Sequence, residues 1–348
     1  MKKISILLIL LYMQQAFTCT TMAMQNEKKQ TVVMKSFDFH FDQGYVFINK
    51  KNVMKRSLTL SMNLGKAWSS KYGSITFNQI SRNFPYGGMN EKGLNMEIMW
   101  LDETQYPDVE HSTINESQVI QYILDTAATT DEALEKLKDV SIVPIMATVH
   151  FMICDRSDKC AVVEYLNGKQ VVNHLGSGKE RILQNSVYAD ILPSIQNNLG
   201  SERQSNDELN EIFLSEINEE NFNDEVFKKL EVVKQGSFTV WQIAYNLETL
   251  DVSFRSRNHQ TTKTINLNQF ELNCRESREQ VFSLSQDVDT EGNVRDLFSA
   301  YTNDVDKELL EDFTMVDDNL KSAANMYQRF FHTCKSRTIR INKIKVGK

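Results

Sequence analysis

The first nineteen residues constrain this chain more than any other feature, because they place a cysteine directly behind a leader-like segment. Two lysines precede an apolar run over residues 4–13, and a more polar stretch then leads to Cys19. This layout is typical of a secretory signal peptide, and the run is too short to span a bilayer. We therefore predict that residues 1–18 are removed and that residues 19–348 form a single exported domain, periplasmic or extracellular.

The residues before Cys19 leave one alternative open. A cut in front of Cys19 places Ala16 at position −3 and Thr18 at position −1. A lipoprotein signal also ends before a cysteine, but it requires an aliphatic residue at −3 and a small one at −1, which this segment fits poorly. A lipid-anchored binding protein, with Cys19 blocked by lipid, is therefore the alternative from a different functional class.

The composition limits the classes of partner. The chain has 39 basic and 46 acidic side chains, and loss of the two leader lysines takes the formal net charge from −7 to −9. No block of Lys and Arg is large enough to grip a phosphate backbone, so we expect no nucleic-acid partner. No second segment is apolar enough to cross a bilayer, so we expect no membrane attachment. The six histidines form no HExxH motif or close pair, so we expect neither a metal nor another cofactor.

The five cysteines are compatible with an oxidising compartment. Cys154 and Cys160 flank a short polar loop between two apolar runs, so a disulfide across a hairpin is sterically plausible. Cys274 and Cys334 can also pair, although nothing in the sequence shows it. If these four cysteines form two pairs, Cys19 is left as the expected free thiol.

The hydrophobic periodicity favours an α+β domain with helices packed over sheets. Alternation predicts strands over residues 31–39, 45–49, 57–62, 74–77 and 95–100. Helices are predicted around 119–124, from 130, across 201–235 and after 287. Hairpins are predicted over 150–165 and 238–254.

A cysteine that becomes the first residue of a chain carries a thiol and an α-amine on one residue. Their pKa values in small peptides are about 8.5 and about 8. The amine can therefore act as the base for the thiol without a separate histidine. Such a site needs a carboxylate that orients the amine, and a nearby cation favours the thiolate. Cys19 is the candidate nucleophile of this kind.

Five short motifs, in matching order and spacing, resemble the choloylglycine hydrolase family of bile salt hydrolases, penicillin V acylases and related linear amide hydrolases. They are Cys19-Thr20, residues 35–39 (KSFDF), 90–94 (NEKGL), 149–155 with 161–164, and 183–186 (LQNS). The resemblance covers residues 19–267. It implies a four-layer αββα N-terminal-nucleophile fold. It also implies hydrolysis of a linear, non-peptide amide through a thioester intermediate, without a cofactor.

The resemblance also implies roles for individual residues. Cys19 would attack the amide carbonyl, and Asp38 would orient its α-amine. Asn185 would donate a hydrogen bond to the oxyanion, a contact worth about 3 kcal/mol in comparable sites. Lys35 stands where bile salt hydrolases have arginine, and it keeps the charge but not the planar fork. Arg203 is the candidate for a further arginine of the family pattern.

Several residues are expected to contact the substrate. Trp100 occupies the position of the family's second oxyanion contributor, where its backbone N–H can serve as the donor and its indole would instead form a wall of the pocket. The segment beginning at Asn78 is expected to supply polar contacts. Apolar candidates for the wall of an acyl pocket are Phe77, Phe84, Tyr86, Met99 and Trp100.

The substrate stays open among bile conjugates, penicillin V, N-acyl homoserine lactones and N-acyl amino acids. Lys35 favours a general linear amide over a conjugated bile salt. An inactive relative and an acyltransferase on the same fold are the further alternatives, since an acyltransferase differs only in the acceptor of the thioester. Relatives often form tetramers, so the resemblance implies a homo-oligomer.

Overall fold

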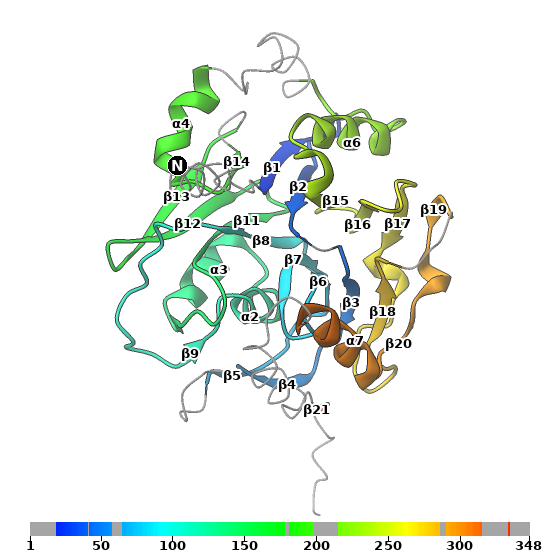
Figure 1. Cartoon of the computed structure of the whole chain (residues 1–348), viewed down its shortest axis with the longest axis horizontal. Helices are drawn as coiled ribbons and strands as arrows, with labels where there is room; N and C mark the ends of the chain where they lie inside the picture. The colour runs from blue at the N-terminus through cyan, green and yellow to red at the C-terminus, as the bar shows by residue number, and fades with distance from the viewer. Residues whose placement is uncertain are drawn as a thin grey trace, which may run out of the picture.

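The computed structural model describes residues 19–40, 42–57, 65–177, 181–197, 215–285, 290–314 and 333–334. The predicted leader and the candidate Arg203 lie outside these residues. Two large, mainly antiparallel sheets form the body of the molecule, with helices outside them (Figure 1).

Seven strands form the first sheet. In spatial order they are β14 (Ile182–Leu183), β1 (Thr20–Gln25), β2 (Thr31–Asp38), β15 (Thr239–Asn246), β16 (Asp251–Ser256), β17 (Lys263–Asn266) and β19 (Gly292–Asn293). Strand β1, which begins beside the candidate nucleophile, and strand β2, which ends there, therefore lie inside this sheet and not at an edge.

Nine strands form the second sheet. In spatial order they are β13 (Lys169–Leu175), β12 (Cys160–Leu166), β11 (Val149–Asp155), β8 (Leu94–Trp100), β7 (Pro85–Asn90), β6 (Ser74–Asn78), β3 (Tyr45–Asn49), β18 (Gln280–Ser283) and β20 (Ser299–Ala300). Its centre, where β8 and β7 lie, faces the middle of the first sheet, because apolar residues of both sheets share one core cluster.

Helices cover the outer faces of both sheets. Helices α2 (Gln118–Thr126) and α3 (Thr130–Leu137) pack on the nine-stranded sheet, and α6 (Phe222–Val232) packs on the seven-stranded sheet. The order helix, sheet, sheet, helix confirms the predicted αββα architecture. No helix in the described ranges is long and apolar enough to cross a membrane.

Smaller elements complete the fold. They are helices α4 (Tyr188–Asn197) and α7 (Asn303–Thr314), the short helices η1 (Gly236–Phe238), η2 (Leu267–Gln269) and η3 (Arg295–Leu297), and the strands β4 (Val53–Arg56), β5 (Ala67–Ser69), β9 (Thr113–Ile114), β10 (Ser141–Ile142) and β21 (Thr333–Cys334).

Alternation along β2 explains how the layers form. Val33 and Phe37 point between the two sheets, whereas Val32 and Met34 point towards α6. Successive side chains of a strand face opposite ways, so Lys35 shares the inner face with Val33 and Phe37. All eight residues of β2 are buried. A lysine on this inner face must therefore find its partners inside the sandwich.

Most predicted elements are present. Strands β2, β3, β6 and β8 lie where alternation placed them, and both predicted hairpins form as β11–β12 and β15–β16. For the strand predicted over 57–62, Ser57 is outside a strand, because β4 ends at Arg56, and residues 58–62 lie outside the described residues. Within the described residues after 287, the predicted helix begins only at Asn303, because residues 292–293 and 299–300 form β19 and β20 on the edges of the two sheets.

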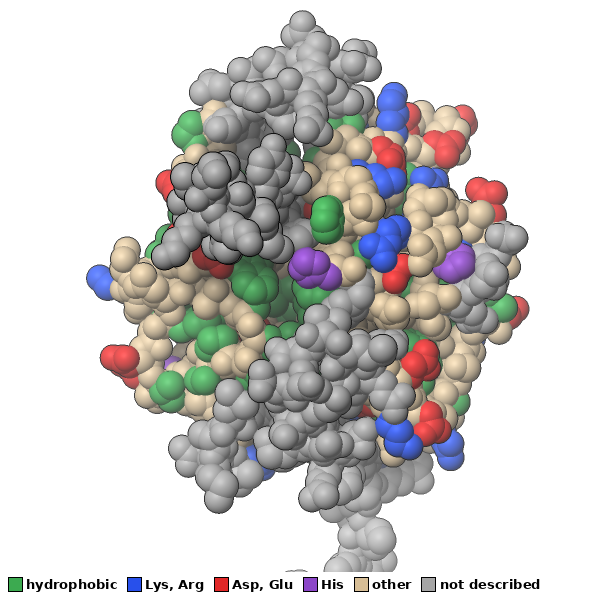
Figure 2. Space-filling model, in the orientation of Figure 1, with side chains coloured by type: hydrophobic (Ala, Val, Ile, Leu, Met, Phe, Trp, Pro, Cys, Tyr) green, Lys and Arg blue, Asp and Glu red, His purple; other side chains and the backbone are tan. Residues whose placement is uncertain are grey.

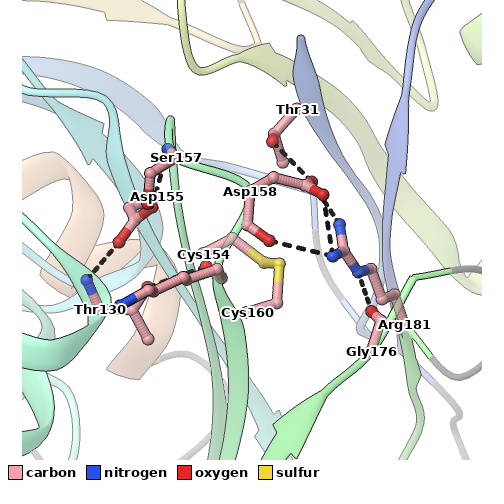
Figure 3. The surroundings of a disulfide bond; sticks show 10 residues. Thr31, Thr130, Cys154, Asp155, Ser157, Asp158, Cys160, Gly176 and Arg181 are labelled. Carbon is pink, nitrogen blue, oxygen red and sulfur yellow. Dashed lines mark hydrogen bonds and ion pairs between the residues drawn. A yellow bond between two sulfur atoms is a disulfide. The ribbon is translucent and has the colours of Figure 1, made fainter. Parts of the chain in front are cut away.

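Cys154 and Cys160 form a disulfide that closes the turn between β11 and β12 (Figure 3). Beside it, Asp158 pairs with Arg181 at 3.1 Å and accepts a hydrogen bond from Thr31 Oγ1 at 2.9 Å. Arg181 directly precedes β14 and Thr31 begins β2, so the turn touches both neighbours of β1. The closed turn therefore braces the strands around the start of the chain.

We expect the double substitution Cys154→Ser/Cys160→Ser to lower the free energy of unfolding by about 2 kcal/mol, because the short cross-link constrains the unfolded chain. Chemical denaturation of the oxidised wild type and the variant measures this loss. The oxidised variant keeps the disulfide of Cys274, so the comparison of the two oxidised proteins isolates the Cys154–Cys160 cross-link. Identical midpoints for the two oxidised proteins would contradict a stabilising role for the cross-link.

Candidate active site

Cys19 lies at the head of β1 and is buried, with 6% of its surface exposed. Its Sγ accepts a hydrogen bond from the Asp38 backbone N–H at 3.4 Å and donates one to the Asp38 carbonyl at 3.6 Å. Burial raises the pKa of the Cys19 thiol to about 11, against the lowering effect of Lys35. Cys19 is also the free cysteine among the described residues, while Cys274 is disulfide-bonded. A neutral thiol in such surroundings needs a base before it can attack.

Asp38 ends β2 beside Cys19. The register of β1 with β2 pairs Thr20 with Ser36, so Phe37 lies opposite Cys19 and Asp38 lies one residue past it. The Asp38 Oδ1 accepts a hydrogen bond from the Thr239 hydroxyl, but its buried Oδ2 has no partner among the described residues. Burial raises the pKa of the Asp38 carboxyl to about 7, opposed by hydrogen bonds from Thr239 and Ser36 and by Lys35. One carboxylate oxygen is therefore free to accept a donor at the head of β1.

Lys35 crosses from the seven-stranded sheet to the nine-stranded sheet. Its Nζ donates to the carbonyls of Ile98 at 2.7 Å and Tyr86 at 3.1 Å, and it lies 3.0 Å from Glu97 Oε2. The two carbonyls accept two of the three N–H donors of the ammonium, and Glu97 supplies the opposite charge. Lys35 is paired with Thr21 across β1 and β2, two residues from Cys19. Its charge acts on the thiol from a buried position between the sheets.

Glu97 is the counter-charge that Lys35 requires. It is fully buried on β8, where Asn95 Nδ2 donates to Oε1 at 3.0 Å. Burial raises the pKa of Glu97, and the charge of Lys35 acts in the opposite direction. Gly87 of β7 leaves the space for this carboxylate, because a Cβ at Gly87 would lie 1.9 Å from Oε2. The pair therefore depends on a glycine in the neighbouring strand.

Asn185 lies two residues after β14, the strand that pairs with β1. This strand pairs Leu183 with Thr21, and the same antiparallel register sets Asn185 opposite Cys19. Its buried Oδ1 has no partner among the described residues. The segment is held from behind by Glu164, whose Oε1 accepts the Tyr188 N–H at 2.8 Å and lies 3.1 Å from His150 Nδ1. The Oδ1 of Asn185 is thus without a described partner, while the segment that follows it is anchored at Tyr188.

The other predicted contact residues do not all lie at the site. Met99 lies at the site, because its Sδ accepts a hydrogen bond from Thr21 Oγ1 at 3.0 Å. Phe77 shares the inner core with Cys19 and packs against the rings of Trp241 and other aromatic residues. Asn78 is turned away and donates to the carbonyls of the loop at residues 81–82. Arg203 lies outside the described residues.

Trp100 ends β8 with its side chain 48% exposed and its indole N–H donated to Asp102. The Leu101 N–H donates to the Thr148 carbonyl. Because N–H groups alternate sides along a strand, the Trp100 N–H points to the opposite side of β8. The Ile98 carbonyl that binds Lys35 points to that same side. The backbone of Trp100, and not its indole, is therefore directed towards the buried cation.

Figure 2 shows hydrophobic side chains gathered in the middle of one face, over β7 and β8. Within the described part of the chain, no three His, Cys, Asp or Glu side chains are grouped as metal ligands. Sequence reasoning missed Glu97 and Thr239 as partners of Lys35 and Asp38. The pairing of Glu97 with Lys35 could have been suspected from the sequence. Glu97 is the lone acid in the apolar strand 94–100, Lys35 is the lone lysine in the strand 31–38, and their charges are opposite.

Comparison with known families finds a match. Residues 19–188 match the model of the linear amide C–N hydrolases, choloylglycine hydrolase family. This segment of the chain is therefore similar to that family. The match begins at Cys19, the first described residue.

Individual known proteins show the same similarity. A penicillin V acylase of Pectobacterium atrosepticum is 32% identical over 140 residues, which are 35% of this chain and 37% of that protein's length. The structure of a penicillin V acylase from Agrobacterium tumefaciens covers 82% of this chain and 98% of its own, with a TM-score of 0.68 and 22% identity. A conjugated bile acid hydrolase from Clostridium perfringens covers 76% and 96%, with a TM-score of 0.59 and 18% identity. Both structures share the fold of this chain.

We expect Lys35→Met to lower the free energy of unfolding at pH 8 by about 3 kcal/mol, because it leaves the Glu97 carboxylate buried without its counter-charge. The double variant Lys35→Met/Glu97→Gln should recover most of this loss. Chemical denaturation of both variants and of Glu97→Gln completes the cycle. Additive losses would show that the two charges do not stabilise each other.

Proposed function

We propose that this protein is an exported amidase that hydrolyses linear, non-peptide amides through an N-terminal Cys19. The observation that carries the proposal is the buried thiol beside a carboxylate oxygen of Asp38 that lacks a donor. Removal of residues 1–18 would create an α-amine on Cys19 at the head of β1, where that oxygen lies. The amine then supplies both the missing donor and the missing base.

The reaction follows from these groups. The neutral α-amine of Cys19 takes the thiol proton, and Sγ attacks the carbonyl carbon of the amide. The tetrahedral oxyanion receives hydrogen bonds from the Asn185 side-chain amide and the Trp100 backbone N–H. Collapse breaks the carbon–nitrogen bond, and the leaving amine takes the proton from the α-ammonium. Water, deprotonated by the same amine, then hydrolyses the thioester and releases the acid.

Asp38 and Lys35 support this chemistry, but neither residue forms or breaks a covalent bond in it. The Asp38 carboxylate orients the amine and stabilises its protonated form after the thiol proton has moved. Lys35 lowers the pKa of the thiol, but its pairing with Glu97 limits that effect. The nucleophile therefore relies on its own amine more than on a permanent thiolate.

The surroundings favour an apolar acyl group. Met99 and Phe37 border the nucleophile, and the buried charge of Lys35 is already paired with Glu97 and not with an anionic group on a substrate. Among the candidate substrates, this supports neutral aliphatic or aromatic acyl amides, including the phenoxyacetyl amide of penicillin V. We further propose a periplasmic or extracellular location and, from its relatives, a homo-oligomeric assembly.

We expect Cys19→Ala to reduce amide hydrolysis by about 10⁴-fold or more, because no other described residue supplies a nucleophile at this position. Release of p-nitroaniline from acyl p-nitroanilides measures the loss, and thermal unfolding shows that the variant is folded. Wild-type rates in the folded variant would refute the assignment of the nucleophile. Transfer to added amines in place of water would identify an acyltransferase, and a lipid on Cys19 would identify the anchored binding protein.

Asn185→Ala should lower kcat by about 10²- to 10³-fold with a smaller change in KM, because the lost hydrogen bond forms mainly in the transition state. Asn173→Ala is a matched control. Its side chain donates to Glu164 at 3.4 Å behind the site and should leave kcat within a few-fold of wild type. Equal kcat values for the two variants would remove Asn185 from the oxyanion site.

A further inference from the structure

Tyr86 occupies an irregular position at the entry of β7. The register between β6 and β7 pairs Phe77 with Gly87 but Asn78 with Pro85, so Tyr86 is one extra residue in the ladder. An extra residue of this kind is a β-bulge, which redirects a side chain and is frequent beside active sites. Tyr86 accordingly packs against both the core between the sheets and the core under α2 and α3.

The redirected ring lies beside the nucleophile. Its centroid is 5.1 Å from the ring of Phe37, which the strand register sets opposite Cys19, and 6.3 Å from the ring of Phe39. The Tyr86 carbonyl accepts from Lys35 Nζ at 3.1 Å, which fixes the backbone of the bulge. The phenol is thus held in place by the same cation that acts on the thiol.

The hydroxyl of Tyr86 is buried and makes no hydrogen bond with any described residue. Burial raises the pKa of this hydroxyl above its usual range, and negative charge on Glu116 and Cys19 raises it further. It is therefore a neutral donor at any working pH, within electrostatic range of the nucleophile.

An unpartnered buried hydroxyl costs free energy of folding, since it has given up water without a replacement. The neighbouring phenol of Tyr106 shows the ordinary arrangement, because its Oη accepts the Val149 N–H at 3.3 Å. A bound ligand that accepts a hydrogen bond from the Tyr86 hydroxyl would explain why this donor has no protein partner.

We propose that the Tyr86 hydroxyl is a specificity-determining donor that binds an oxygen in the acyl part of the substrate. The inference rests on the proposed amidase function. The rings of Phe37 and Phe39 make the surroundings of the hydroxyl apolar, which suits the acyl side and not the leaving amine. The preferred substrates are amides whose acyl group carries an ether, keto or hydroxyl oxygen close to the scissile carbonyl and an apolar end beyond it.

A matched pair of substrates tests this assignment. Butoxyacetyl and heptanoyl p-nitroanilides have acyl chains of equal length and differ by one oxygen in place of a methylene. The ratio of their kcat/KM values should fall about tenfold from wild type to Tyr86→Phe, because one neutral hydrogen bond is lost with one substrate only. Comparing ratios between the two proteins cancels the different intrinsic reactivity of the two amides.

Two controls separate specificity from structure. Tyr106→Phe removes a phenol hydroxyl from the same outer core and should leave the substrate ratio unchanged. The melting temperature of Tyr86→Phe should equal or exceed that of wild type, because the hydroxyl has no protein partner to lose. An unchanged substrate ratio, with or without a lower melting temperature, would overturn the proposal.

Binding in the Cys19→Ala background separates this proposal from the proposed function. Titration calorimetry gives the dissociation constants of the butoxyacetyl and heptanoyl amides for the protein with Tyr86 and for the Tyr86→Phe variant. The preference for the butoxyacetyl amide over the heptanoyl amide should be about tenfold greater with Tyr86 than with Phe. If wild type releases no p-nitroaniline but this preference is found, the amidase proposal fails and the role of Tyr86 stands. If turnover occurs without the preference, the role of Tyr86 fails and the amidase stands.

Discussion

The Lys35–Glu97 ion pair is the interaction on which the site depends. It joins β2 of one sheet to β8 of the other across the middle of the sandwich, and both side chains are buried. Two charges taken out of water need close pairing and further hydrogen bonds, and here two backbone carbonyls and Asn95 supply them. The pair thereby fixes the distance between the strand that bears the nucleophile's neighbours and the strand that ends at Trp100.

This pairing also determines how the nucleophile is activated. A free cation beside a thiol would favour the thiolate, but Glu97 offsets the charge of Lys35, and burial keeps the pKa of Cys19 high. A local base is then required, and Asp38 offers an unpartnered oxygen where the α-amine of a processed Cys19 would lie. Lys35 thus serves as an anchor between the sheets, through two hydrogen bonds to carbonyls and one ion pair.

Much of this arrangement could be predicted from the sequence, because strand alternation and the spacing of motifs are local. The inner-face positions in β2 and the β11–β12 hairpin with its disulfide follow from such patterns, whereas Asn185 was singled out by the resemblance of residues 183–186 to a family motif. The partners of buried polar groups could not be predicted, since they come from the other sheet. Glu97 meets Lys35 and Thr239 meets Asp38 only after strands distant in sequence have packed.

The role of Tyr86 shows the same limit at a finer scale. Composition placed it among apolar wall residues, and only the register slip between β6 and β7 reveals that its ring is redirected towards Phe37. Likewise, alternation assigns Trp100 and Asn78 to strand ends but does not state which face they occupy. A shift of one residue in pairing reverses the face, so these orientations depend on long-range register.

The most direct test of the account is the intact mass and N-terminal sequence of the protein recovered after export, before and after alkylation of free thiols. The account predicts a chain that begins at Cys19 with an unmodified α-amine and gains one alkyl group on that residue. A chain that begins at another residue, or a Cys19 that carries lipid, would contradict the claim that the thiol and amine of one residue perform the chemistry.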